Sequence, residues 1–172
     1  MPTGSCICGA IKYSFDVQPS AKVSTHTTPE HSHPQDTLRV ITHTPLNHQC
    51  LCHCLSCRRI TGTTAASVAL IPKADFQTTA SAESVPSFRQ NTITHEAGMQ
   101  ITYVFCSDCG TTCWKTANAG WPDQIIVFTG TLDDASFEQF KPDAEFWVKY
   151  RAPWLESLEG KGVAQVQGFP EA

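Results

Sequence analysis

The sequence has no long apolar run. None of its segments approaches the roughly 18 consecutive apolar residues that a membrane-spanning helix requires, so we expect no association with a membrane. The N-terminus has no basic region followed by an apolar stretch, which predicts that there is no secretory signal. We therefore expect a cytoplasmic protein in a reducing environment, where clustered cysteines serve as metal ligands more often than as disulfides.

An excess of basic residues is also missing. Twelve Lys and Arg residues stand against 16 Asp and Glu residues, which gives a formal net charge of −4. The basic residues are dispersed, and the adjacent pair Arg58-Arg59 is the one exception. Because a nucleic-acid binder usually needs a basic face that neutralises phosphates, we expect no nucleic-acid partner.

Helical periodicity is weak, with short candidates at 55–61 and 134–139 only. Segments rich in β-branched and aromatic residues predict strands instead, at 10–17, 64–71, 100–105, 111–116, 124–131 and 145–151. Short strands divided by Gly, Pro and Asp turns are typical of a mostly β fold with few short helices. A chain of 172 residues fits a single domain, 1–172, with a core of its own.

Residues 18–48 differ in composition from the rest of the chain. They are rich in Thr, Ser and Pro and contain five of the seven histidines. One interpretation is a third metal site or a lid over the active site. We favour a polar surface loop, with one short strand at 38–42, because the irregular histidine spacing gives little geometric focus.

Cysteine, by contrast, is abundant. All nine cysteines fall into three clusters, at 6–8, 50–57 and 106–113. An odd number argues against complete disulfide pairing. Thiols separated by one or two residues suit tetrahedral metal coordination, because each close pair offers two sulfurs to the same ion. Three clusters exceed the needs of one site, so the sequence predicts two zinc ions.

The first and last clusters share a glycine after their second cysteine. In Cys106-Ser-Asp-Cys109-Gly110 the glycine tolerates the backbone conformation that turns amides toward sulfur. The segment around Cys6 and Cys8 has the same signature with a tighter gap. Joining the two pairs would complete a closed four-thiolate site, which is structural and contributes directly to folding.

The middle cluster allows two interpretations. Three thiolates, from Cys52, Cys54 and Cys57, with water or a substrate as fourth ligand, make an open and catalytic site. Four thiolates, with Cys50 or Cys113 as the last, make a second structural site. In an extended chain Cys50, Cys52 and Cys54 face the same side, because strand side chains alternate.

The charge of an open site indicates its chemistry. Three thiolates on Zn²⁺ leave a net charge of −1, so this zinc is a weaker Lewis acid than one held by three neutral histidines. A soft substrate thiol is then a more fitting fourth ligand than water, held as thiolate and presented to an electrophile. We therefore expect thiol chemistry.

Ordered motifs cover most of the chain: GSCICGAIKY (4–13), CHCLSCRRITG (52–62), FCSDCGT (105–111), TGTLDD (129–134) and WVKYRAPWL (147–155). Together they resemble the glutathione-dependent formaldehyde-activating enzyme family, which includes centromere protein V. The resemblance implies a β-tent-like zinc-binding fold of packed antiparallel sheets and two zinc ions. It also implies a carbon–sulfur lyase that reversibly joins glutathione and formaldehyde into S-hydroxymethylglutathione.

The same resemblance implies ligand sets. Those of the structural zinc are Cys6, Cys8, Cys106 and Cys109. Those of the catalytic zinc are Cys52, Cys54 and Cys57. A small-molecule substrate such as glutathione is anionic, and the candidates to bind it are Arg58, Arg59, Lys149 and Arg151.

Other side chains have two interpretations each. His53 is a candidate proton shuttle, but in a strand it would face away from the metal. The four tryptophans, Trp114, Trp121, Trp147 and Trp154, line an apolar substrate pocket or belong to the core, and the core is favoured. The alternative function is a non-enzymatic zinc scaffold that binds a protein partner, since fold alone does not fix function.

Overall fold

The structure of the protein is a computed structural model that describes residues 1–16, 49–78 and 84–168. The histidine-rich segment 18–48, with its expected strand at 38–42, therefore lies outside the described residues. In the described part of the chain, no helix is long and apolar enough to cross a membrane.

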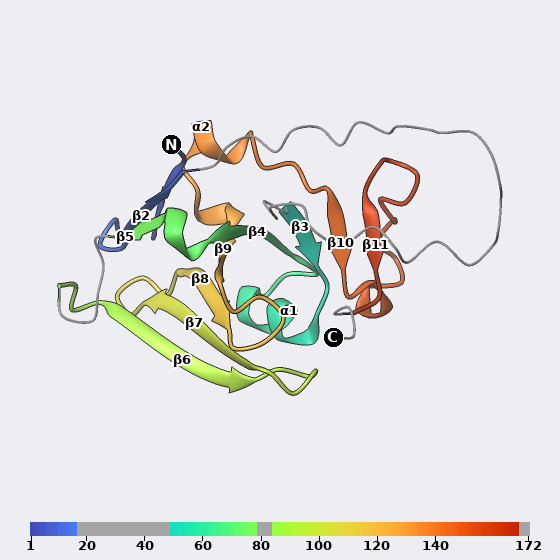
Figure 1. Cartoon of the computed structure of the whole chain (residues 1–172), viewed down its shortest axis with the longest axis horizontal. Coiled ribbons are helices and arrows are strands. Elements are labelled where there is room, and N and C mark those ends of the chain that lie inside the picture. Colours follow the sequence, from blue (N-terminus) through green and yellow to red (C-terminus); the bar gives the residue numbers. More distant parts are fainter. Residues whose placement is uncertain (17–48, 79–83, 169–172) are drawn as a thin grey trace.

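The strands of the described structure form two β-sheets (Figure 1). The smaller sheet has the order β1-β2-β5 and is formed by β1 (Thr3–Ser5), β2 (Lys12–Phe15) and β5 (Phe76–Thr78). The larger sheet has the order β11-β10-β3-β4-β9-β8-β7-β6. Its strands are β3 (Gln49–Cys52), β4 (Ala66–Pro72), β6 (Phe88–Thr94), β7 (Gln100–Cys106), β8 (Thr112–Ala117), β9 (Gln124–Phe128), β10 (Ala144–Phe146) and β11 (Ala164–Val166).

Helices in the described residues are short. They are the α-helices α1 (Leu55–Thr61) and α2 (Asp134–Phe137), and the 3₁₀ turns η1 (Lys73–Asp75), η2 (Thr129–Thr131) and η3 (Val148–Tyr150). The prediction of a mostly β fold with few short helices is confirmed. Most strand pairs are antiparallel, as the resemblance implies, but β10 runs parallel to both β3 and β11. Parallel neighbours need a crossover connection, and β3 and β10 are separated by most of the chain.

Two predicted strands end earlier than expected. The segment at 145–151 is a strand only as far as Phe146, because Trp147 has a φ of 61° and the chain then enters η3. A residue in the left-handed region cannot continue a pleated strand. The segment at 124–131 likewise ends at Phe128 and passes into η2.

The centre of the larger sheet is buried on both faces. Along β4, Ala69 and Ile71 belong to one core cluster while Val68 and Leu70 belong to the other. Side chains on a strand alternate between the faces of a sheet, so the two clusters lie on opposite faces. The first cluster contains Tyr13 of β2 and the second contains Cys57 of α1, so the smaller sheet and α1 cover opposite faces.

Candidate functional site

Two cysteines near the N-terminus and two from the middle of the chain meet on the face that the smaller sheet covers. The Sγ atoms of Cys6, Cys8, Cys106 and Cys109 all lie within 4.8 Å of one another. Each pair is followed by a glycine with positive φ, 75° at Gly9 and 74° at Gly110, and those glycines close the turns that present the sulfurs. The predicted pairing of these two clusters agrees with this geometry.

The pKa values of two thiols in this group, Cys109 and Cys8, are shifted in opposite directions. Hydrogen bonds from the side chain and backbone of Thr111 lower the pKa of Cys109 to about 5. A backbone N–H at Ala10 lowers the pKa of Cys8, but contacts with the sulfurs of Cys6 and Cys106 outweigh it and raise that pKa to about 12. Closely packed thiols can bind a divalent cation together, because the metal displaces their protons when it binds.

Cys113 lies on the same side of the sheet as this group. It is fully buried and packs in the core cluster that contains Cys6 and Cys106. The three cysteines of the middle cluster belong to the opposite cluster. The structure therefore separates Cys113 from the middle cluster, for which the sequence had offered it as a fourth ligand.

The middle group is formed where β3 passes into α1. Cys52 ends β3, Cys54 is the N-cap of α1 and Cys57 lies in the first turn, and their Sγ atoms all lie within 4.8 Å of one another. The Cys54 sulfur accepts a hydrogen bond of 3.3 Å from the Cys57 N–H, which begins the helix. Gly62, at a φ of 64°, ends it.

The three thiols of this group are buried, and the group holds no fourth ligand among the residues that the structure describes. Cys50 faces the same side of β3 as Cys52, as predicted, but its sulfur is not part of the group. Burial raises the pKa of the Cys50 thiol well above its usual range. Two cysteine-rich groups of this structure can thus hold metal ions, one with four sulfurs and one with three.

Lys115 adds a cationic side chain to the middle group, and the sequence analysis did not identify it. It lies on β8, buried on the face of α1, and its Nζ donates to Cys57 Sγ over 3.0 Å. Burial alone lowers the pKa of Lys115, but the nearby thiols of Cys57 and Cys52 outweigh it and raise that pKa well above its usual value. Contacts with Cys52 and Cys54, helped by the charge of Lys115, hold the pKa of Cys57 well below its usual range.

A β-bulge explains why alternation along β8 does not reveal this lysine. The register of β7 and β8 shifts between Val104 and Phe105, which interrupts the inward and outward pattern. Lys115 is then placed opposite Tyr103 and Ile126. Only the pairing of three strands, β7, β8 and β9, shows that Lys115 faces the middle cysteines.

An enclosed cavity of about 20 Å³ adjoins the three-cysteine group. Lys115, Cys54 and His95 contribute polar atoms to its wall, while Trp121 and Trp147 are among its apolar lining residues. A cavity of this size holds one or two water-sized molecules. Of the four tryptophans, Trp121 and Trp147 thus line a pocket.

The remaining two tryptophans do not line this cavity. Trp114 belongs to the core cluster on the opposite face of the sheet. Trp154 is 73% exposed.

A hairpin between β6 and β7 brings His95 and Glu96 to α1. Glu96 accepts from the Leu55 N–H and the Ser56 hydroxyl, each over 2.6 Å, and so satisfies groups at the start of the helix. Ligand atoms of Cys54, His95 and Glu96 lie within 4.8 Å of one another. Because both carboxylate oxygens are already occupied by α1, capping explains the position of Glu96.

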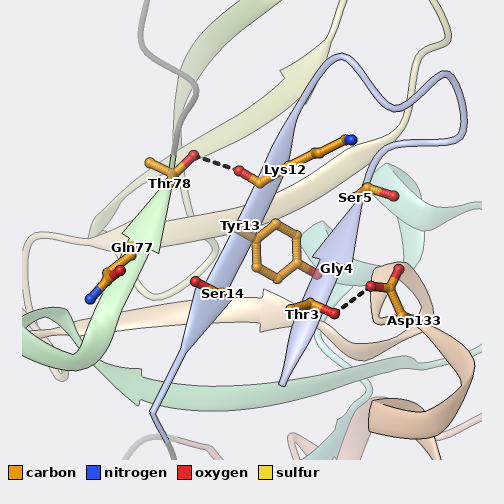
Figure 2. A pocket seen from close by; sticks show the side chains of 9 residues that line it. All are labelled: Thr3, Gly4, Ser5, Lys12, Tyr13, Ser14, Gln77, Thr78 and Asp133. Atoms are coloured by element: carbon orange, nitrogen blue, oxygen red, sulfur yellow. Dashed lines mark hydrogen bonds between the residues drawn. The ribbon is translucent and has the colours of Figure 1, made fainter. Parts of the chain in front are cut away.

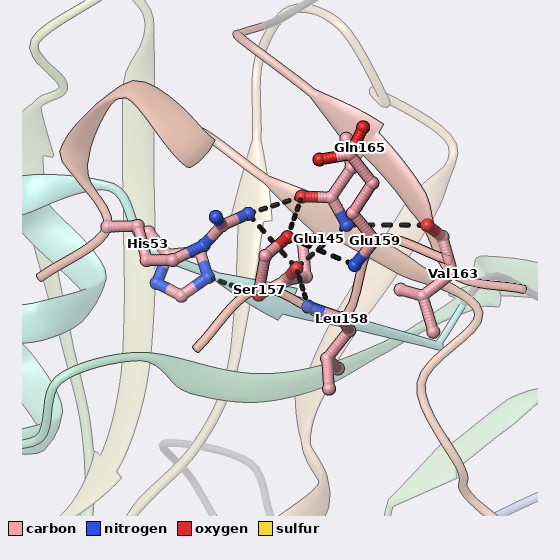
Figure 3. Close-up of polar contacts among 8 residues, drawn as sticks. His53, Glu145, Ser157, Leu158, Glu159, Val163 and Gln165 are labelled. Atoms are coloured by element: carbon pink, nitrogen blue, oxygen red, sulfur yellow. Dashed lines mark hydrogen bonds and ion pairs between the residues drawn. The ribbon is translucent and has the colours of Figure 1, made fainter. Parts of the chain in front are cut away.

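His53, which the sequence offers as a proton shuttle, points into a buried polar network (Figure 3). Its Nε2–H donates to Glu145 over 2.9 Å. Glu145 of β10 is 1% exposed and also accepts from Arg151, Gln165 and the Leu158 N–H. Burial alone raises the pKa of Glu145, but these donors hold it below its usual value. The network ties the cysteine loop to the C-terminal segment.

The four basic residues predicted to bind substrate are not among those that line the cavity. Arg59 and Lys149 are exposed, Arg58 donates to the Tyr150 carbonyl over 3.3 Å, and Arg151 is paired with Glu145. The Nζ of Lys149 lies 4.9 Å from the centre of the Trp147 ring.

A larger and more open depression lies on the smaller sheet. Its volume is about 570 Å³, and hydroxyl groups of Thr3, Ser14 and Thr78 contribute to its lining together with Lys12 and Asp133 (Figure 2). None of its lining residues is a cysteine. Because cysteines line only the smaller of these two cavities, the smaller one is the candidate functional site.

Comparison with known proteins gives one family. The model described as "Glutathione-dependent formaldehyde-activating enzyme" matches residues 37–150, which is well over half of the chain. The matched segment contains the three-cysteine group, Lys115 and both cysteines of the 106–113 cluster that join the four-cysteine group. Cys6 and Cys8 precede it. No curated protein matches the chain.

Proposed function

Because the chain belongs to the glutathione-dependent formaldehyde-activating enzyme family, we propose that it is a zinc-dependent carbon–sulfur lyase. Its substrate would be the adduct of a thiol, such as glutathione, with a small carbonyl compound. One zinc ion would be structural and held by Cys6, Cys8, Cys106 and Cys109. A second, catalytic zinc would be held by Cys52, Cys54 and Cys57.

The observation that carries this proposal is the incomplete ligand set of the three-cysteine group. Thiolates are the ligands that zinc accepts in tetrahedral sites, and three of them leave one position free. A bound zinc would supply affinity for a thiol sulfur and polarise a carbonyl oxygen. Cys52 and Cys54 are also among the residues that line the cavity, so a ligand in the free position would extend toward it.

The chain's own residues would select the reactants by size and exclude water. Trp121, Phe146 and Trp147 surround the cavity with apolar surface, and the rings of Trp121 and Phe146 meet edge to face at 5.5 Å. A volume of about 20 Å³ is closer to the size of a one-carbon carbonyl group than to that of an aromatic one. We therefore favour a formaldehyde-like electrophile over the aromatic substrate that the tryptophans alone would allow.

Basic residues near Trp147 would bind the carboxylates of a peptide thiol. Tyr150 stacks on Trp147 with ring centres 6.0 Å apart. Arg58 donates to the carbonyl of Tyr150, and the Nζ of Lys149 lies 5.2 Å from its ring centre. Lys149 is thus adjacent to Trp147 of the cavity wall, and Arg58 is linked to that wall through Tyr150. Arg151 is paired with Glu145 and would have a structural role.

Two measurements test the proposal. One is the rate at which ¹³C-formaldehyde exchanges with its glutathione adduct, followed by NMR. The other is the number of zinc ions bound per protein. We expect the wild-type protein to bind two zinc ions and to accelerate the exchange. Cys54→Ser should retain one zinc and the fold but exchange no faster than the uncatalysed reaction. Cys50→Ser, a neighbouring buried cysteine outside the group, should retain both zinc ions.

Two results would overturn the proposal. Wild-type protein with both zinc ions that does not accelerate exchange, with formaldehyde or acetaldehyde as the carbonyl, is not a lyase of this type. Loss of one zinc ion from Cys50→Ser would mean that Cys50 closes the site, which favours the scaffold interpretation.

A further inference from the structure

Of the lysines that the structure describes, only Lys115 is buried. Taking an ammonium group out of water is costly unless an anionic partner compensates for it. The described residues provide no carboxylate ion pair for Lys115. Its Nζ instead donates to Cys57 Sγ over 3.0 Å, and lies 5.8 Å from the centre of the Tyr103 ring. The compensating charge must therefore come from the thiolates.

The charges of the three-cysteine group balance only if this lysine is included. A divalent cation with three thiolates carries −1, and a charged Lys115 brings the sum to zero. The surroundings are apolar, with Ile101, Trp121 and Phe146 on the cavity wall. An uncompensated charge is expensive in such surroundings, whereas a neutral set is not.

The four-cysteine group has a different environment. Cys8 is exposed and Cys109 is partly exposed, so water can screen the charge of four thiolates and one cation. The backbone N–H of Ile11 donates to Cys6 Sγ over 3.3 Å, and the Thr111 hydroxyl lies 3.2 Å from Cys109 Sγ. Neutral donors and solvent are therefore enough to compensate for the charge of the four-cysteine group. This group serves as a comparison within the same protein for the buried three-cysteine group.

We propose that Lys115 is a positioning residue that supplies the counter-charge of the Cys52–Cys54–Cys57 metal site through its hydrogen bond to Cys57. This inference rests on the proposed function only in that a metal occupies the site. Through this hydrogen bond of 3.0 Å, Lys115 draws electron density from the Cys57 sulfur. It thereby makes the bound cation a stronger electrophile than three thiolates alone would allow.

The test is the affinity of each site for Co²⁺, measured by competition with a chelator in Lys115→Met and Lys115→Arg. Loss of a partner that donates to a metal ligand typically weakens metal binding about 10- to 100-fold. We expect that loss at the three-cysteine site of Lys115→Met, with the four-cysteine site unchanged. Lys115→Arg, which keeps the charge, should recover most of the affinity. Lys161→Met, an exposed lysine, is the control and should leave both sites unchanged.

A spectroscopic measurement separates this role from mere packing. A hydrogen bond to a thiolate stabilises the sulfur electrons, so its loss should move the sulfur-to-cobalt charge-transfer band of the three-cysteine site to lower energy. Folded Lys115→Met with unchanged affinity and an unchanged band would overturn the proposal. If Lys115→Met does not fold, ¹⁵N NMR of wild-type zinc protein decides: an ammonium signal for Lys115 supports the proposal and a neutral amine refutes it.

These outcomes are distinct from those of the proposed function. If the protein has no exchange activity but Lys115→Met still weakens metal binding at the three-cysteine site, the role of Lys115 stands and the lyase proposal fails. An active lyase in which Lys115→Met changes neither affinity nor spectrum loses this inference alone.

Discussion

Replacing Glu145 by Gln tests the buried polar network that holds His53, which lies between Cys52 and Cys54. The side chain is 1% exposed, and its two oxygens accept from four donors. Oε1 accepts from His53, while Oε2 accepts from the Gln165 amide over 2.7 Å, the Leu158 N–H over 3.0 Å and Arg151 over 3.1 Å. Glu145→Gln keeps the shape but removes the charge and places an NH₂ group against donors.

The expected cost follows from these contacts. Removing one partner of a buried ion pair typically costs about 3–5 kcal/mol, because the other charge is left unpaired. Arg151 is 18% exposed, so water screens part of that loss, and glutamine retains one acceptor oxygen. We expect the free energy of unfolding at pH 7 to fall by about 2–4 kcal/mol. For a chain of this length that corresponds to a decrease in Tm of roughly 5–12 °C.

The effect should also depend on pH. The pKa of Glu145 is lower in the folded protein than its usual value of 4.5, so folding favours the charged carboxylate. Its contribution is therefore complete above the unfolded pKa and is lost as the pH falls through the folded pKa. The difference in stability between wild type and Glu145→Gln should be constant from pH 6 to 8 and shrink below about pH 4.5.

Urea unfolding of zinc-loaded protein measures this difference. Glu156→Gln, which removes an exposed carboxylate from the same part of the chain, should change stability by less than about 0.5 kcal/mol. If Glu145→Gln is no more destabilising than Glu156→Gln, the four hydrogen bonds to Glu145 do not stabilise the fold as argued. Our reasoning would then be wrong.

Two further predictions concern the N-terminal sheet and its cysteine group. In Gly4→Ala the new Cβ would meet two atoms of the Tyr13 ring system at 2.4 Å and the Thr131 carbonyl at 2.6 Å, so we expect a loss of about 1–3 kcal/mol in urea unfolding. Gly130→Ala, where no atom lies within 4 Å, should lose less than half as much, and equal losses would contradict the steric argument. In metal-free protein the pKa of Cys109 is about 5, so its alkylation by iodoacetamide should level off above about pH 6. Peptide mapping by mass spectrometry measures this rate, and a further increase of about tenfold per pH unit up to pH 8 would refute the low pKa.

The cysteine groups were predictable because their geometry is mostly local. A one- or two-residue gap followed by a glycine fixes how two sulfurs converge, whatever the rest of the fold does. The same holds for α1, whose predicted range of 55–61 agrees with the structure. Cys54 begins that helix and Gly62 ends it, and both signals lie within the segment itself.

The residues that the sequence did not reveal all depend on distant pairing. Lys115 reaches Cys57 only because β7, β8 and β9 align around a bulge. Glu145 reaches His53 only because β10 pairs in parallel with β3, which brings Phe146 opposite Cys52. Glu96 caps α1 from a hairpin some 40 residues further along the chain. Composition and spacing carry no information on such contacts, since they are set by strand register.

Lys115 also changes the expectation that came from charge alone. Three thiolates on zinc predict a weakly electrophilic site with a charge of −1, but an ammonium 3.0 Å from one of those sulfurs offsets it. At an effective dielectric constant of about 20, that pair attracts by about 5 kcal/mol, which is comparable to the cost of several kcal/mol for burying a lysine. A Lys115 ammonium and a Cys57 thiolate would therefore stabilise each other in this buried position. A metal ion and Lys115 can together compensate for the three thiolates, which gives a buried site that is neutral overall and still has a free coordination position.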